Sequence, residues 1–226
     1  PFDLKSTTTT CDHCAGGCEI RADHRHHQVK RHQAGDAPEV NEEWLCDKGR
    51  FGFVSGRGED RLTRPLVRRN GVLQAASWPE AIDAAVAGLK AAGTAVGVLP
   101  GGRLTVENAY AYSRFARTVL GTNNIDFRSR AASEEEAEFL AARIAGRGMD
   151  VTYADLEAAT HVVLVSYEPE DETSVVFLRL RKAVRKHGLK VTTLAPFASR
   201  GTQKLSATLI PVAPGAEAQT LEAMEL

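Results

Sequence analysis

The chain has only four cysteines, and all of them lie within its first 46 residues. They are Cys11, Cys14, Cys18 and Cys46, in the pattern C-x2-C-x3-C-x27-C. Three cysteines within eight residues are too close together for a set of independent disulfides. Glycines in the segment 15–17 would let the backbone wrap closely around a bound group. The sequence therefore predicts a metal centre.

Thiolate ligands suit both zinc and iron–sulfur clusters, so the spacing has to separate the two. Structural zinc sites usually combine two short segments, each of which supplies two ligands, such as C-x2–4-C or H-x3–5-H. Here one arm carries three cysteines and Cys46 completes the set, which suits the four corners of a [4Fe-4S] cubane better. Lys48 and Arg50 follow directly, and their charges would stabilise an anionic cluster. We expect four cysteine ligands with Lys48 and Arg50 as cofactor-binding residues; a zinc-stabilised interaction module is the alternative.

The cysteine pattern, with Cys-Asp-Lys-Gly-Arg at 46–50, resembles the [4Fe-4S] domain that opens molybdopterin oxidoreductases. Within that superfamily the chain is most similar to the family of large peripheral-arm subunits, the G subunits, of bacterial NADH-quinone oxidoreductase (complex I). The segments that carry this closer resemblance are 41–53, 101–126 and 168–182.

The resemblance implies an iron–sulfur subunit of an enzyme that passes electrons from NADH to quinone, coupled to proton translocation. Its cluster would be an additional one beside the main electron path, with a redox or a structural role. The implied partners are other subunits of the peripheral arm, at the cytoplasmic face of the bacterial inner membrane. The other clusters would be held by cysteines outside this sequence, so no complete catalytic centre is expected here. Both ends of the sequence look like cuts inside a longer protein.

Residues 1–75 read as a small β-rich module that would contain the cluster site. Short alternating runs at 18–22 and 28–31 predict strands, and Asn-Gly within 66–74 predicts a hairpin.

Residues 76–226 alternate between apolar runs of strand length and helical patterns. Such alternation predicts a parallel-sheet α/β domain that resembles the molybdopterin oxidoreductase fold. The expected strands are 94–100, 161–166, 191–194 and 207–212. Helices are expected after Ser77, Thr105 and Ser133 and over 172–187, and the second of them should bury Val106, Ala109, Tyr110 and Ala116.

The cofactor of the family, a molybdopterin guanine dinucleotide, is not expected in this chain. Molybdenum enzymes of the family carry a metal ligand just after a segment like 123–126, where Ser129 is the one candidate here and no thiolate is present. The carboxylates of 168–172 would repel a pyrophosphate, and nothing nearby in the sequence neutralises them. A fragment of a formate dehydrogenase or nitrate reductase catalytic subunit is the alternative enzyme.

Other classes of function find little support. The 28 basic and 29 acidic residues give a net charge of −1, which argues against a nucleic-acid partner. No apolar run approaches the roughly 20 residues that span a bilayer, so we expect no direct membrane insertion.

A solvated edge of the β-rich module explains the remaining histidine cluster better than a second metal site does, and His13 is expected to shape the turn between two ligands. That cluster consists of His24, His26, His27 and His32.

Overall fold

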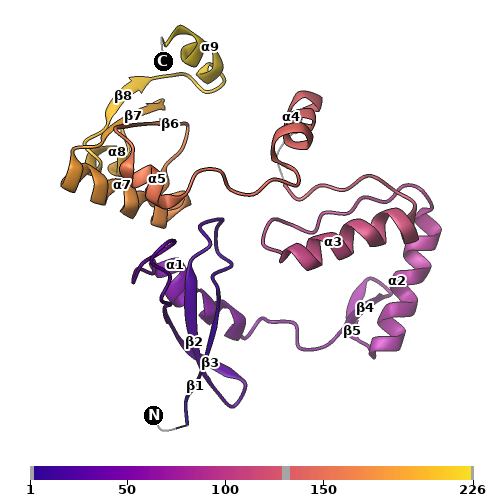
Figure 1. Ribbon diagram of the computed structural model, residues 1–226. Helices are drawn as coiled ribbons and strands as arrows, with labels where there is room; N and C mark the ends of the chain where they lie inside the picture. The colour runs from indigo at the N-terminus through magenta and orange to yellow at the C-terminus, as the bar shows by residue number, and fades with distance from the viewer. Residues whose placement is uncertain (1–2, 129–132, 225–226) are drawn as a thin grey trace. The chain divides into compact units, whose positions relative to one another are not determined.

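Figure 1 shows a computed structural model of the chain, which describes residues 3–128 and 133–224. The chain forms two units. The first contains the chain up to residue 53 together with the part from residue 146 onward, and the second is 54–145. Within the described residues, no helix has the length and apolar character needed to cross a membrane.

The first unit begins with an antiparallel sheet in the order β1-β2-β3. Its strands are β1 (Lys5–Thr10), β2 (Glu19–Arg25) and β3 (Gln28–Ala34), of which β1 is not among the predicted strands. His26 and His27 have left-handed backbone angles (φ 49° and 60°) and form the tight turn between β2 and β3. The carboxylate of Asp23 is 2% exposed and accepts hydrogen bonds from Ser6 on β1 and Arg31 on β3, so it joins all three strands.

The chain then continues through α1 (Asp47–Phe51) and a 3-10 turn, η1 (Gly52–Arg57). Cys46 is the N-cap of α1, and the N–H of Arg50 donates to its carbonyl oxygen at 2.9 Å. The fourth cysteine therefore sits at the start of a helix, where the first backbone N–H groups have no partner within the helix.

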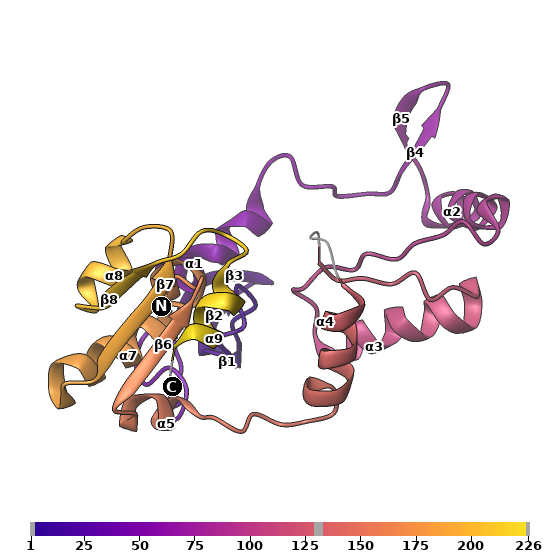
Figure 2. The ribbon, with the colours of Figure 1, turned by 90° about the horizontal axis from the view of Figure 1, so that it is seen from above.

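The rest of the first unit is a parallel sheet in the order β6-β7-β8. Its strands are β6 (His161–Val165), β7 (Lys190–Ala195) and β8 (Thr208–Pro211). The helices are α5 (Tyr153–Ala158), α6 (Pro169–Glu172), α7 (Ser174–His187), α8 (Arg200–Lys204) and α9 (Glu217–Ala223). Figures 1 and 2 show α5 and α7 next to each other, and the core includes Leu164, Phe177, Leu180, Val191 and Leu205.

The predicted α/β architecture is confirmed, and so are the strands in 161–166, 191–194 and 207–212. The helix predicted over 172–187 differs at its start. Pro169 opens a separate short helix, α6, and α7 begins only at Ser174. The predicted end is right, because Gly188 adopts the left-handed conformation (φ 71°) that stops a helix.

The second unit contains the predicted hairpin, β4 (Leu66–Arg69) and β5 (Val72–Ala75), turning at Asn70 and Gly71 with positive φ. Ser77 and Glu80 form the expected capping box of α2 (Trp78–Ala92). The further helices are α3 (Val106–Phe115) with the π-helical turn η2 (Ala116–Leu120), and α4 (Glu134–Phe139) with η3 (Leu140–Ile144). Thr105 and Ser133 cap α3 and α4 as predicted.

Two predictions for the second unit are wrong. In place of a strand at 94–100, the described residues have a single parallel bridge between Val98 and Ile125. An apolar run forms a buried strand only where strands on either side pair with it. Among the described residues of this unit, Ile125 alone pairs with the run, through Val98. The expected buried face of α3 is also exposed: Val106 is 83% and Tyr110 66% exposed, while Ala116 is buried.

Candidate metal centre

The four cysteines lie on neighbouring segments of the first unit. Cys11 follows β1, Cys14 and Cys18 lie in the loop before β2, and Cys46 caps α1. The N–H of Cys11 donates to the carbonyl oxygen of Cys18 at 2.8 Å, which closes this loop. All four are free thiols. No three His, Cys, Asp or Glu side chains in the described part of the chain are arranged to hold a single metal ion.

The thiols nevertheless share one electrostatic environment. Burial, followed by the charges of Cys11, Cys14 and Cys46, raises the pKa of Cys18 to about 11. Burial also raises the pKa of Cys11, although a backbone hydrogen bond opposes the shift. Thiolates whose charges act on one another in this way need a compensating positive charge, and bound iron supplies one. A cubane has its irons at four separate corners, so its ligands need not meet at a single point.

Two glycines bring the backbone close to the sulfurs. A Cβ atom on Gly49, in α1, would lie 3.1 Å from Sγ of Cys11 and 2.6 Å from Cδ1 of Leu45. A Cβ atom on Gly16 would lie 3.4 Å from Sγ of Cys14. A larger residue at position 49 would press on Leu45 and Cys11, and one at position 16 would press on Val175, whose Cγ1 would lie 3.0 Å from the added Cβ atom. The donor set and the close backbone therefore fit an iron–sulfur group.

Lys48 and Arg50 both lie on α1, next to Cys46. The Nζ of Lys48 donates to the carbonyl oxygen of Asp171 at 2.6 Å, so this side chain joins α1 to α6. Arg50 is half-buried. We propose that both side chains stabilise an anionic cluster through their positive charges, without contacting it.

Tyr153 and Arg179 also support the site, and sequence reasoning missed both. The Tyr153 hydroxyl donates to the carbonyl oxygen of Gly16 at 2.7 Å, across 137 residues of sequence. The guanidinium of Arg179 donates to the carbonyl oxygens of Pro38 (2.5 Å) and Val40 (2.7 Å). Arg179 is 6% exposed, so a buried charge holds the segment that leads to Cys46. The one available signal was an arginine at a core-facing position of the predicted helix.

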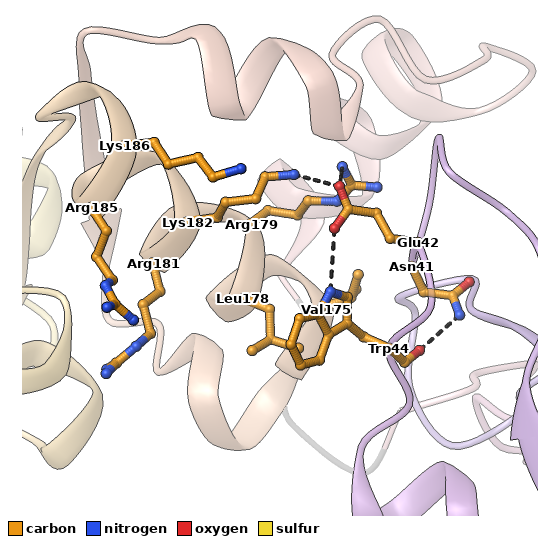
Figure 3. A pocket seen from close by; sticks show the side chains of 10 residues that line it. All are labelled: Asn41, Glu42, Trp44, Val175, Leu178, Arg179, Arg181, Lys182, Arg185 and Lys186. Atoms are coloured by element: carbon orange, nitrogen blue, oxygen red, sulfur yellow. Dashed lines mark hydrogen bonds and ion pairs between the residues drawn. The ribbon is translucent and has the colours of Figure 1, made fainter.

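Carboxylates neutralise this buried charge. Arg179 pairs with Glu157 (2.9 Å) and Glu42 (3.2 Å), and Lys182 pairs with Glu157 (2.6 Å) and with Glu42. The hydrogen bond from Lys182 lowers the pKa of Glu42. Figure 3 shows Glu42 between the two cationic side chains and the indole N–H of Trp44. The network therefore joins α5 and α7 to the cysteine-bearing module.

The histidines have separate places. His24 is half-buried, with Nε2 3.1 Å from Oγ1 of Thr7. The solvated edge expected for His32 is wrong: its Nδ1 lies 2.9 Å from the carbonyl oxygen of Gly49, and its ring packs 5.0 Å from that of Phe53. His32 thus contacts α1 itself. His13 lies against Gly52, where a Cβ atom would approach its Nε2 to 2.7 Å.

A cavity of about 560 Å³ lies at the carboxyl ends of the parallel strands. Its lining includes Glu168, Asp171, Glu172 and Glu217. The sequence offers no neutralising charge near the segment 168–172, but in the fold Lys204 pairs with Glu170. Lys204 is 34 residues further along the chain, on α8, so no local pattern in the sequence indicates this pairing. Ser129, the candidate molybdenum ligand, lies outside the described residues.

Two family models match the chain. The molybdopterin oxidoreductase Fe4S4 domain matches residues 4–55, and molybdopterin oxidoreductase matches 61–225. The G subunit of NADH-quinone oxidoreductase from Streptomyces coelicolor is 56% identical over 99% of this chain, and that from Mycobacterium bovis is 56% identical over 98%. NADH-quinone oxidoreductase subunit 3 of Thermus thermophilus is 37% identical over 81% of this chain and 22% of its own length. The chain spans 28% of the length of the first two relatives. The chain therefore belongs to the molybdopterin oxidoreductase family, with an Fe4S4 domain in its N-terminal part.

Proposed function

We propose that this chain is an iron–sulfur part of an NADH-quinone oxidoreductase and holds one [4Fe-4S] cluster through Cys11, Cys14, Cys18 and Cys46. The observation that carries the proposal is 56% identity, over nearly the whole chain, to the G subunit of such an enzyme. The shared electrostatic environment of the four thiols supports the ligand set. When bound, such a cluster exchanges single electrons with neighbouring redox centres.

The residues around the thiols would prepare the site for this group. Gly16 and Gly49 leave space beside two sulfurs, and Tyr153 fixes the loop that carries Cys14. Lys48 and Arg50 add positive charge on α1, which would favour four thiolates over four thiols. No side chain of this chain is proposed to make or break a bond in substrate.

The whole enzyme would pass electrons from NADH to quinone, coupled to proton translocation. The partners would be other subunits of its peripheral arm, at the cytoplasmic face of the membrane. The 28% share of the relatives' length is consistent with other clusters and the NADH site lying elsewhere in the enzyme. We propose no molybdopterin in this chain, because carboxylates line the cavity at the carboxyl ends of the sheet.

We also propose a functional division into a cluster module, 1–75, and an α/β domain, 76–226. The change of pattern at Ser77 and the hairpin that ends at Ala75 support it. Limited proteolysis of the native protein tests this division. Cleavage next to residue 75 is expected, and first cleavage within 54–65 would contradict it.

Metal analysis tests the cofactor and separates the alternatives. We expect anaerobically prepared protein to contain iron and acid-labile sulfide at about four each per chain. Zinc at one per chain, without sulfide, would favour the zinc-stabilised interaction module. Molybdenum together with guanine would favour a formate dehydrogenase or nitrate reductase subunit. Either result would overturn the proposal.

A further inference from the structure

A groove of about 570 Å³ lies in the first unit, between the segment 41–44 and α7 (Figure 3). Trp44, Val175 and Leu178 give it an apolar surface. The side chain of Trp44 is 56% exposed although its neighbours are aliphatic. Exposed indoles next to aliphatic side chains are typical of the central residues of protein interfaces.

Hydrogen bonds order the wall of the groove. The amide of Asn41, which is 1% exposed, donates to the carbonyl oxygen of Trp44 at 2.8 Å and accepts from the N–H of Glu19 at 2.8 Å. The indole Nε1–H of Trp44 points to the carboxylate of Glu42 at 3.3 Å. Such order reduces the entropy lost when a partner binds.

The groove carries an excess of positive charge. Lys182 and Arg179 are neutralised by Glu42 and Glu157. The other cations have no carboxylate partner among the described residues, and one of them donates only to the carbonyl oxygen of Lys204, at 3.3 Å. These cations are Arg181, Arg185 and Lys186. Such a local excess on one helix contrasts with a net charge of −1 for the whole chain.

We propose that this groove docks an acidic segment of a neighbouring subunit, one with an apolar side chain flanked by carboxylates. The apolar surface would receive the side chain, and the cations of α7 that lack a carboxylate would pair with those of the segment. A small inorganic anion would leave Trp44 and Leu178 uncovered, and a basic or neutral segment would leave the cations unpaired. The inference rests on the proposed function, because it requires the chain to work inside a multi-subunit enzyme.

Site-specific photocrosslinking tests the proposal in the assembled NADH-quinone oxidoreductase. A benzoylphenylalanine replaces Arg185 at the groove, and in the matched control it replaces Lys190, which is exposed and outside the groove. We expect the groove probe alone to crosslink to a segment of another subunit that contains several Asp or Glu residues. Crosslinks to lipid, to the chain itself or to a segment without carboxylates would overturn the proposal, and so would the absence of crosslinks.

Charge reversal provides a second test of the docking proposal. The double variant Arg185→Glu/Lys186→Glu should weaken retention of the crosslinked subunit by about tenfold. Reversal of the mapped carboxylates to lysine should restore that retention. The control, Lys190→Glu/Arg200→Glu, changes the same charge outside the groove and should have no effect. Equal retention by both double variants would contradict the docking role.

The two proposals can fail separately. Iron content and NADH oxidation by the unmodified complex test the proposed function. Normal values of both, without a groove crosslink, would overturn the docking site alone. A chain that never joins such a complex would overturn the proposed function and, with it, this partner.

Discussion

Arg179 offers the sharpest test of how the α/β part supports the cluster module. Its guanidinium donates to Pro38, Val40 and Glu157, from a side chain that is almost fully buried. Replacement by Met keeps much of the aliphatic stem and removes every donor. The segment 38–42, which leads toward Cys46, would then lose the main-chain contacts that Arg179 makes from α7, and the pair between Lys182 and Glu42 would still hold it there.

The size of the effect follows from the environment of each partner. Pro38 is exposed, so its carbonyl can bind water instead. The half-buried carbonyl of Val40 would lose its donor at a cost of about 1–3 kcal/mol. Loss of a charged hydrogen bond to Glu157 would add about 1.5–3 kcal/mol, reduced because Lys182 still pairs with that carboxylate. We therefore expect Arg179→Met to lower the free energy of unfolding by about 2–4 kcal/mol.

Urea unfolding under anaerobic conditions measures this loss. With a slope of about 2 kcal/mol per molar, the midpoint should fall by about 1–2 M. The control Arg185→Met removes an arginine from an exposed position of the same helix and should change the free energy of unfolding by less than about 0.5 kcal/mol. The reasoning would be refuted if the two variants unfolded at the same urea concentration.

Three further predictions concern the site itself. Gly49→Ala should destabilise by about 1–3 kcal/mol and reduce iron content, because its Cβ atom would press on Leu45 at 2.6 Å and on the Sγ of Cys11 at 3.1 Å. Gly88→Ala, also in a helix but with nothing within 4 Å, should stabilise by up to about 1 kcal/mol, and equal effects of the two changes would contradict the packing argument. Tyr153→Phe should cost about 1–3 kcal/mol in urea unfolding while the variant still binds iron, since a buried carbonyl loses its donor; an unchanged midpoint would rule out that role. Glu42 has a lowered pKa in the folded chain, so its stabilising effect is present above pH 4.5 and is lost as the pH falls through the folded value. Glu42→Gln should therefore show a shallower loss of stability in acid than the unmodified chain, and parallel curves would contradict the assignment.

The parts of the site that sequence could predict are local. Cys11, Cys14 and Cys18 share one short loop, so their spacing alone indicates a common ligand. The hairpin at Asn70-Gly71 and the N-caps at Ser77 and Thr105 also depend only on nearby residues, and all of them are found.

The parts that sequence could not predict depend on distant contacts. Tyr153 reaches Gly16 across 137 residues, and Arg179 reaches Val40 across 139. Neither residue carries a motif that names its partner. The prediction of a strand at 94–100 was wrong for the same reason. Strand formation depends on neighbouring strands, which the apolar run itself does not indicate.

Spin quantification by EPR shows whether Cys46 and the other three cysteines hold a [4Fe-4S] cluster. The reduced, anaerobically prepared protein should give the signal of a reduced [4Fe-4S] cluster at about one spin per chain. Replacement of Cys46 by Ala should remove that intact signal, whereas Lys90→Ala, on the exposed surface of α2, should keep it. An undiminished signal from the Cys46→Ala variant would contradict the ligand assignment, and no iron–sulfur signal from the unmodified chain would contradict cluster binding.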